Sequence, residues 1–398
     1  MGSSDIAAEL NAWLDENWSD ELTVRQWWRL LAEAGWAFPT WPAGYGGRAE
    51  SSAVALLVQD VLLRRQLIGP PHGIAVTMLA PTVLRHGTLE QKQNILPRIV
   101  RGELTSCQLF SEPGAGSDLA GLQTSARLVD GEWVVNGQKV WNSHAHDSDL
   151  GMLLARTNPT APKHDGISFL LIPMVQAGVD VRPLRQMNDE VEFNEVFLTD
   201  AHVPRDNVLG EVDAGWRVTQ TTLGSERSAL PARALTPPAG ERPGWLDRVA
   251  CEVYRELQAT GSKAKELYPR SGNAARRLAQ QVGKWDDQVV RDRVMQLHVL
   301  SEANRALTRR LGVTRIAGAP SIVKLAAADL ARNARDIDLD ILGSAALLSG
   351  PDAAMGGEIE LMALSAHKVS IGGGTDQIQK NILSERVLGL PKEKRDRA

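Results

Sequence analysis

The sequence predicts an α+β protein in which a β-domain separates two helical domains. Apolar residues recur at helical spacing over about the first hundred positions, short β-type runs follow over about the next hundred, and helical spacing then returns. This order differs from the strand–helix alternation of a doubly wound sheet. A chain of 398 residues has room for two or three domains. We expect a helical domain over 1–105, a β-domain over 106–212 and a second helical domain over 213–398.

The composition excludes several functional classes. A net charge of −4 gives no basis for binding nucleic acid or an anionic membrane surface. Two cysteines, Cys107 and Cys251, cannot form a disulfide framework, which favours a reducing compartment. Residues 1–5 lack the basic and apolar regions of a secretory signal, and no apolar run approaches the roughly 20 residues of a membrane span. We expect a cytoplasmic protein with no membrane span.

The first domain is expected to be helical around one loop. Helical spacing covers the N-terminal segments and three later stretches: 52–66, 72–86 and 89–101. The loop is the Trp-Pro-Ala-Gly-Tyr-Gly-Gly string at 41–47, which interrupts the helical pattern.

The β-domain is marked by short apolar runs and turn dipeptides. The runs include 133–135, 152–154 and 167–171, and an alternating strand is expected over 192–204. Tight turns are predicted at two dipeptides, Asp130-Gly131 and Asn136-Gly137.

The helical pattern of the last domain begins at about Gly215. Its longest stretch runs from about Asn273 to Leu311, after a Pro/Gly-rich break at 237–240.

The segment 109–121, Leu-Phe-Ser-Glu-Pro-Gly-Ala-Gly-Ser-Asp-Leu-Ala-Gly, has the composition of a ligand-binding loop. An apolar run stops at Pro113, and Gly114 and Gly116 free the backbone for close approach to a ligand. The glycine spacing is not that of a dinucleotide fingerprint, and no Gly-Lys-Ser/Thr follows as in a P-loop. Taken alone, the string fits a plain turn equally well.

A second candidate, Trp141-Asn142-Ser143, follows a predicted strand. An indole at this place can stack on a planar ligand, with the Ser143 hydroxyl bonding a ring nitrogen or carbonyl. A rim tryptophan beside a turn serine is the competing interpretation. The His144-Ala145-His146-Asp147 segment has no second ligand cluster at metal-site spacing, so we expect a polar loop and no metal.

The loop string and the tryptophan triplet together resemble the flavin- and CoA-contacting segments of the acyl-CoA dehydrogenase family. The resemblance implies a fold with an N-terminal helical domain, a central β-barrel or sheet domain and a C-terminal helical bundle. It implies FAD as cofactor, an acyl-CoA substrate and an electron-transfer flavoprotein as acceptor. The residues it implies for FAD are Gln108, Phe110, Ser111, Trp141, Ser143, Thr375 and Gln377. Those it implies for the substrate are Ser117 and Arg227.

The resemblance offers two positions for the catalytic base. In many family members the base carboxylate lies just before a Gly-Thr near the C-terminus, where this chain has Gly373, which cannot be a base. Asp376 is a substitute, although its position predicts a cap for the following helix. In other members the base lies on the first long helix of the last domain, and the segment 222–227 resembles that site.

Helical spacing independently places Glu226 in an uncharged face of that helix, formed by Val218, Thr222, Glu226 and Leu230. Desolvation on such a face raises the pKa of a carboxylate, which suits a base working near neutral pH. We favour Glu226 because its segment resembles the family's second base site and Gly373 offers no carboxylate at the usual one. A glutamate paired with a neighbouring arginine, or one exposed on a wrongly phased helix, remains the alternative.

Two departures from the family concern the part of the FAD site that neighbouring subunits complete. The family's Arg-X-X-Phe-Gly is absent from 274–285, and its Gln-Ile-Leu-Gly-Gly appears at 340–344 with Asp340 in place of glutamine. An acidic residue facing a phosphate is unfavourable. This pattern resembles subunits of actinobacterial heteromeric acyl-CoA dehydrogenases, some of which act on steroid side-chain thioesters. We expect a homo- or hetero-tetramer, with α2β2 as one arrangement.

The function that the resemblance implies is α,β-dehydrogenation of an acyl-CoA thioester, with a bulky or steroid side chain as one substrate class. Glu226 would remove the α-proton while hydride leaves for flavin N5. Two alternatives stay open. One is a non-catalytic partner subunit of a heteromeric acyl-CoA dehydrogenase, and the other is a flavin monooxygenase or oxidase of the same fold.

Overall fold

The computed structural model describes five stretches of the chain: residues 3–228, 234–242, 244–264, 271–313 and 316–392. The chain divides into two compact units: Met1–Gln186 with Glu190–Thr260, and Met187–Asp189 with Gly261–Ala398. The domain boundaries expected at 105/106 and 212/213 stay a prediction, because the two compact units have other limits.

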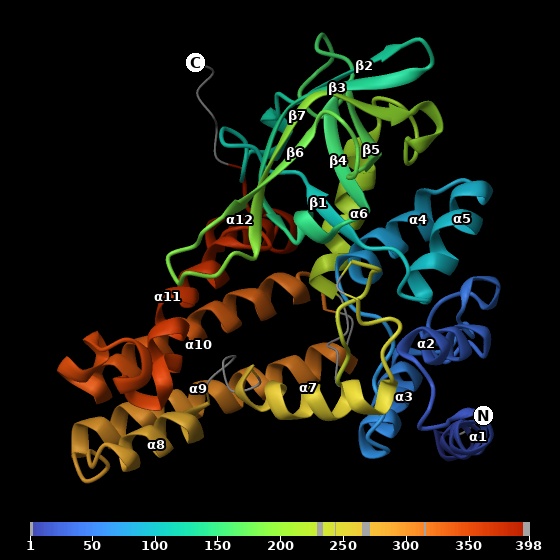
Figure 1. Ribbon diagram of the computed structural model, residues 1–398. Helices are drawn as coiled ribbons and strands as arrows, with labels where there is room; N and C mark the ends of the chain where they lie inside the picture. The colour runs from blue at the N-terminus through green and yellow to red at the C-terminus, as the bar shows by residue number, and fades with distance from the viewer. Residues whose placement is uncertain (1–2, 229–233, 243, 265–270, 314–315, 393–398) are drawn as a thin grey trace. The chain divides into compact units, whose positions relative to one another are not determined.

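The first unit begins with helices α1 (Ser3–Asn17), α2 (Val24–Glu33), α3 (Ser52–Arg64), α4 (Ala80–His86) and α5 (Leu89–Val100) (Figure 1). Their starts follow ordinary capping chemistry: Thr23 and Thr88 each form a capping box with a glutamine three residues on, and Ser51 caps α3. A π-helical turn over Ala75–Leu79 leads into α4, so the helix expected over 72–86 is present in two parts.

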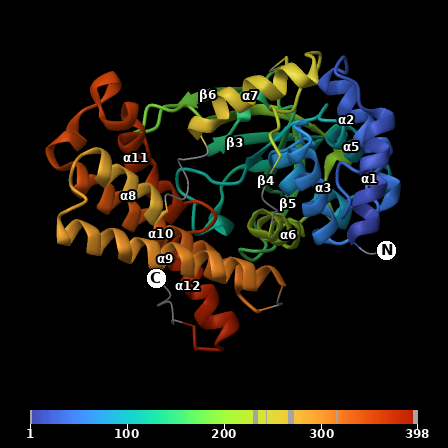
Figure 2. The same ribbon diagram turned by 90° about the horizontal axis from the view of Figure 1, so that it is seen from below.

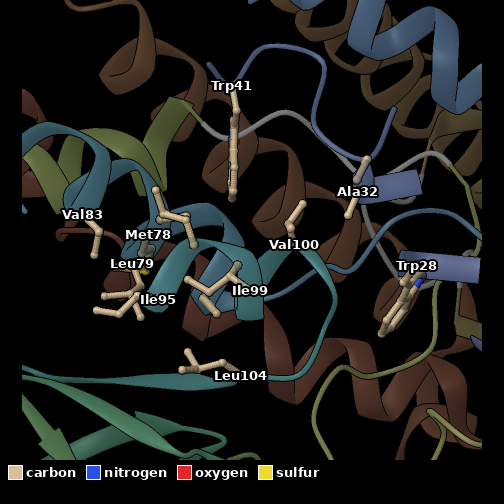
Figure 3. Close-up of a cluster of buried hydrophobic side chains, with 14 of the residues drawn as sticks. Trp28, Ala32, Trp41, Met78, Leu79, Val83, Ile95, Ile99, Val100 and Leu104 are labelled. Carbon is tan, nitrogen blue, oxygen red and sulfur yellow. The ribbon is translucent and has the colours of Figure 1, made fainter. Parts of the chain in front are cut away.

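Buried tryptophans hold these helices together. Trp27 and Trp28 are fully buried, and their indole nitrogens donate to Ile68 O (3.0 Å) and Gly69 O (2.8 Å). Figure 3 shows Trp28 in the same cluster as Val100 and other side chains of α4 and α5. At Gly102, where φ is +68°, a Cβ would lie 2.2 Å from the Trp28 ring. Only glycine therefore fits at this position.

The sheet of the first unit has seven strands in the described residues: β1 (Ser106–Leu109), β2 (Ser125–Val129), β3 (Glu132–Ser143), β4 (Leu150–Arg156), β5 (Ile167–Pro173), β6 (Val179–Leu184) and β7 (Phe193–Pro204). Their order is β1-β4-β2-β3-β7-β6, with β5 pairing β4 from off this path. The turn predicted at Asp130-Gly131 is confirmed as a two-residue hairpin turn with both φ angles positive.

The turn predicted at Asn136-Gly137 is wrong, because β3 continues through both residues. Gly137 has φ +157°, and a Cβ there would lie 2.4 Å from Thr124 Oγ1. The dipeptide marks a register shift between β3 and β7 instead of a chain reversal. It supplies the conformational freedom of a turn inside a strand.

Two further helices complete the first unit, α6 (Gly215–Ser228) and the start of α7 (Ala250–Ala264). The beginning of α6 lies directly on β5, because a Cβ at Gly215 would meet the Phe169 backbone nitrogen at 2.5 Å. Figure 1 shows α6 running from the sheet towards the N-terminal helices.

The second unit contains α8 (Gly272–Gln281), α9 (Gln288–Val313), α10 (Ala319–Leu342), α11 (Glu358–Ile371) and α12 (Asp376–Asn381), the first four of which pack side by side (Figure 2). The single helix expected over about 273–311 is wrong. The chain turns at Gly283, where φ is +71°, and Asp287 caps the new helix by accepting from Val289 N at 2.8 Å. Leu278, Leu297 and Leu330 belong to a separate core within this unit.

No helix in the described stretches is both long and apolar enough to cross a lipid bilayer.

Candidate functional site

The loop that follows β1 is a short turn with open space around it. Glu112 and Ala115 exchange two backbone hydrogen bonds of 3.0 Å, which encloses the Pro113-Gly114 pair. A Cβ at Gly114 or at Gly116 would have no heavy atom within 4 Å. Ser117 is exposed beyond the turn. The backbone at Gly114 and Gly116 is therefore accessible to a ligand.

Strand β3 is attached to the loop and to the end of β1 on the two sides of Trp141. Val140 N donates to Ser111 O at 2.9 Å, and Asn142 Nδ2 donates to Gln108 O at 2.7 Å. The Gln108 and Asn142 side chains are half-buried and buried, respectively. This double attachment fixes the position of the intervening tryptophan.

Trp141 is displayed outward by a β-bulge. Lys139 pairs Val196 and Asn142 pairs Asn194, so two residues of β3 oppose the single Glu195 of β7. Trp141 adopts φ +63°, its side chain is 57% exposed, and its ring meets Phe193 edge-on at 5.9 Å. A left-handed backbone is unfavourable for a bulky residue, and such strain clusters at functional sites.

Ser143 ends β3 next to a supported polar cluster. It is half-buried and pairs with Phe193, while Asn194 Nδ2 donates to Asn142 O at 2.9 Å. His146 Nδ1 lies 3.1 Å from Asn194 Oδ1. Within the described part of the chain, no group of three His, Cys, Asp or Glu side chains could hold a metal ion.

Phe110 contributes to the core and not to an exposed surface. Its side chain is 3% exposed and packs edge-on against Phe169 at 5.8 Å. Only its backbone is left for a ligand, and its carbonyl already accepts from Lys139 Nζ at 3.1 Å.

Glu226 is half-buried on α6, on the same face as two fully packed residues, Val218 and Thr222. The Thr222 hydroxyl lies 2.9 Å from the Thr82 hydroxyl of α4. Thr82 Oγ1 also lies 2.7 Å from Met78 O in the π-helical turn before α4, and Thr222 Oγ1 lies 3.1 Å from Val218 O of α6. Each hydroxyl has one proton, so one of the two threonines donates across the interface. The arrangement anchors α6 to α4 one turn before Glu226. The side chain of Arg227 and the whole of Leu230 lie outside the described residues.

The C-terminal candidates lie in the second unit. Gly373 has φ +66° with open space where a Cβ would stand, while a Cβ at Gly374 would lie 2.7 Å from Gln379 Nε2. Thr375 caps α12 by accepting from Ile378 N at 3.2 Å. Gln377 is exposed in the first turn of that helix.

Asp376 was expected to cap α12, but the cap is Thr375 and the helix begins at Asp376 itself. Its buried carboxylate binds Lys324 Nζ and Arg332 Nη1, both at 2.6 Å. Burial acts to raise the pKa of Asp376, and the hydrogen bonds and charges of the two cations outweigh it and hold the pKa below its usual range. A carboxylate held in this way is a poor general base.

Asp340 does not present an unpaired charge, because it forms an ion pair with Arg293 at the surface of the second unit.

A cavity of about 300 Å³ lies in the first unit beside Ser225, the residue before Glu226. Among its described lining residues none is Asp, Glu, Lys or Arg. Its walls include aromatic rings and prolines, and its one titratable residue is His72, whose pKa is lowered by burial. The cavity therefore suits a group without charge, although hydroxyl and amide side chains also contribute to its walls.

Sequence reasoning missed three residues that shape the site: Glu112, Lys139 and Thr82. Glu112 and Lys139 form a fully internal ion pair beneath the loop, with the Lys139 side chain 0% exposed. A lysine inside an otherwise alternating strand, in phase with its buried residues, is the signal that could have pointed to the pair.

Comparisons with known proteins agree across the chain. Three family models match: the acyl-CoA dehydrogenase N-terminal domain at residues 4–103, the middle domain at 107–201 and the C-terminal domain at 259–388. Acyl-CoA dehydrogenase FadE34 of Mycobacterium tuberculosis is 37% identical over 371 residues, which are 91% of this chain and 46% of that protein. This chain thus spans about half of FadE34.

Two other relatives match over almost their full length. Acyl-CoA dehydrogenase IpdE1 of M. tuberculosis is 32% identical over 409 residues, which cover 98% of both chains. The crystal structure of the ChsE4-ChsE5 complex from M. tuberculosis is 27% identical with a TM-score of 0.70, again over 98% of both chains. The helical, β and helical order expected from the sequence is confirmed by this shared fold. The chain belongs to the acyl-CoA dehydrogenase family.

Proposed function

We propose that this chain carries out FAD-dependent α,β-dehydrogenation of an acyl-CoA thioester to a trans-2-enoyl-CoA. The family is FAD-dependent. The observation that carries the proposal is Trp141, an exposed indole held at positive φ by a bulge and two flanking hydrogen bonds. Holding a bulky residue in this way costs about 1–3 kcal/mol, which a stacked planar ligand would offset.

The residues around Trp141 fit an isoalloxazine ring. Ser143 brings a partly accessible hydroxyl to the same strand end, and the loop at Gly114 and Gly116 leaves space for a large ligand. In this proposal Trp141, Ser143, Gln108, Ser111 and the Phe110 backbone hold the flavin. FAD, when bound, supplies the hydride acceptor.

Other residues extend the proposed site. Ser117, exposed on the loop, would contact the CoA moiety. Arg227 would contact the substrate. Thr375 and Gln377 belong to the other unit and are proposed as FAD contacts only from the resemblance of their own segment, Thr375 through the backbone because its hydroxyl caps α12.

Glu226 is the proposed base that removes the α-proton. A half-buried carboxylate on a helix anchored through Thr222 has a fixed position and reduced solvation, both of which favour proton abstraction. Gly373 offers no carboxylate, and Asp376 is held by two cations.

Replacing Glu226 by glutamine tests this assignment. E226Q should bind FAD as the wild type does and lose acyl-CoA-dependent flavin reduction under anaerobic conditions. The matched variant D376N should lower the stability of the second unit and retain acyl-CoA-dependent flavin reduction. Near-normal flavin reduction in E226Q, or its loss in a folded D376N, would overturn the assignment to Glu226.

The uncharged cavity beside Ser225 supports a bulky acyl group, with a steroid side chain as one class. Filling it by Val76→Trp should raise the KM for bulky acyl-CoA more than for a short straight-chain acyl-CoA. Equal effects on both substrates would argue against this use of the cavity.

The proposed assembly is a tetramer, with α2β2 as one arrangement, that passes electrons to an electron-transfer flavoprotein. A similar structure is titled as a complex of two chains, ChsE4-ChsE5. A non-catalytic partner role is the second candidate, favoured by Gly373 at the position of the usual base. Expression with genomic neighbours, followed by the mass of the complex and its flavin count, separates these cases. One FAD per chain in a single-component tetramer would exclude both the heteromer and the partner role.

A further inference from the structure

A buried ion pair lies directly beneath the proposed flavin surface. The Lys139 ammonium is 2.8 Å from Glu112 Oε1 and 3.1 Å from Phe110 O, and the side chain is 0% exposed. Glu112 is 7% exposed. Lysine is rarely buried in this way unless it is paired, because losing water costs a charge several kcal/mol.

Glu112 closes the loop from the inside. Its Oε2 accepts from Gln123 N at 2.6 Å, and its Oε1 accepts from Thr124 N at 2.9 Å as well as from Lys139. One carboxylate thus joins the start of the loop to its return into β2. Burial acts to raise the pKa of Glu112, and Lys139 together with these donors outweighs it and lowers the pKa.

Lys139 in turn fixes the strand that carries Trp141. It is the last residue of β3 in regular register before the bulge. Its ammonium reaches the carbonyl of Phe110, which immediately precedes Ser111, the acceptor for Val140 N. The side-chain pair and this backbone bond therefore hold the same two segments together, one residue apart on each.

We propose that the Lys139–Glu112 pair is a positioning device, which holds Trp141 and the loop over 111–118 in the arrangement that receives the flavin. This proposal rests on the proposed function. Neither residue contacts the ligand in this scheme, because both side chains are internal. The pair acts through Trp141, Ser111 and the loop backbone.

Two variants test the pair. Lys139→Met keeps the apolar stem and leaves the Glu112 carboxylate buried without its cation. Breaking a buried pair from one side is strongly unfavourable, so we expect FAD binding weaker by about tenfold or more. The double variant K139M/E112Q removes both charges and keeps an amide oxygen as acceptor. It should bind FAD more tightly than K139M alone.

The matched control is Lys163→Met. Lys163 forms an ion pair with Asp118 of the same loop, but both partners are exposed, so this pair contributes little. K163M should bind FAD as the wild type does.

The measurements use the full chain expressed with its genomic neighbours. FAD affinity comes from titration of the flavin-free protein, at a temperature where circular dichroism shows every variant folded. Hydrogen exchange at the Gln123 and Thr124 amides is the second readout, and it should accelerate in K139M before FAD is added.

The outcomes separate this proposal from the proposed function. If the wild type binds no FAD, both fail. If the wild type binds FAD and folded K139M binds it equally well, or if K163M weakens binding as much as K139M, only the positioning role is overturned.

Discussion

The hydroxyl pair between Thr82 of α4 and Thr222 of α6 should stabilise the helix that carries Glu226. Both side chains are fully buried, and their oxygens lie 2.9 Å apart. Thr222→Val keeps the shape and removes one hydroxyl, so the partner loses a buried bond while it still reaches Met78 O at 2.7 Å. A net hydrogen bond contributes about 0.5–1.5 kcal/mol, and Thr82 is not left unsatisfied. We expect T222V to lower the free energy of unfolding by about 1 kcal/mol.

A double-mutant cycle in urea denaturation isolates the pair. T82V/T222V should lower the free energy of unfolding by less than the sum of the two single variants, with a coupling of about 1 kcal/mol. The reason is that the double variant removes both hydroxyls together, whereas each single variant leaves one hydroxyl without the other. Thr219→Val is the matched control, since this buried hydroxyl donates within its own helix to Gly215 O at 2.8 Å. It should cost about 0.5 kcal/mol. Additive costs in the cycle, or equal costs for T219V and T222V, would refute the reasoning.

Three further predictions concern Gly374, Glu112 and Trp141. Gly374→Ala should lower the melting temperature more than Gly373→Ala, because both have positive φ but only the Gly374 Cβ would meet a side-chain nitrogen, at 2.7 Å. Because folding lowers the pKa of Glu112, its ionised carboxylate stabilises the fold at pH values above the pKa of the unfolded chain. This stabilisation is lost as the pH falls through the pKa of the folded state. As the pH is lowered below the ordinary pKa of a glutamate, the melting temperature should therefore fall more steeply for the wild type than for E112Q. Trp141→Asn should leave the flavin-free protein as stable as the wild type or more so, since asparagine tolerates φ +63°, while FAD titration shows affinity reduced by about tenfold.

The order of helices and strands could be predicted because hydrophobic period is a local property. The helices at 52–64 and 89–100 and the strand at 193–204 each lie within a few residues of expectation. The errors occur where a local signal has two structural solutions. Asn136-Gly137 offers positive φ, which serves a hairpin turn or a register shift inside a strand. The apolar spacing of the pattern from Asn273 continues past Gly283, so periodicity alone does not reveal the break.

The interactions that connect the residues of the candidate site cannot be read from the sequence. The Thr82–Thr222 pair joins positions 140 apart, and the Lys139–Glu112 pair joins positions 27 apart. A single sequence names each residue but not its partner. In the sequence Thr82 has no feature that separates it from any other helical threonine. Glu112 lies within a segment whose composition predicts a loop, so its burial is not indicated.

Trp141 shows how one extra residue changes which side chains of a strand are exposed. Along β3 the odd positions Trp133, Val135 and Lys139 are buried, and regular alternation would bury Trp141 with them. The bulge after Lys139 adds one residue to β3, so the buried positions become Val140 and Asn142 and the indole turns outward. The composition of 11 tryptophans cannot distinguish this exposed ring from the buried Trp27 and Trp28. The bulge makes that distinction, so a variant with one residue inserted in β7 opposite the bulge, which restores regular register, should bury Trp141 and abolish FAD binding although it replaces no residue proposed to contact the ligand.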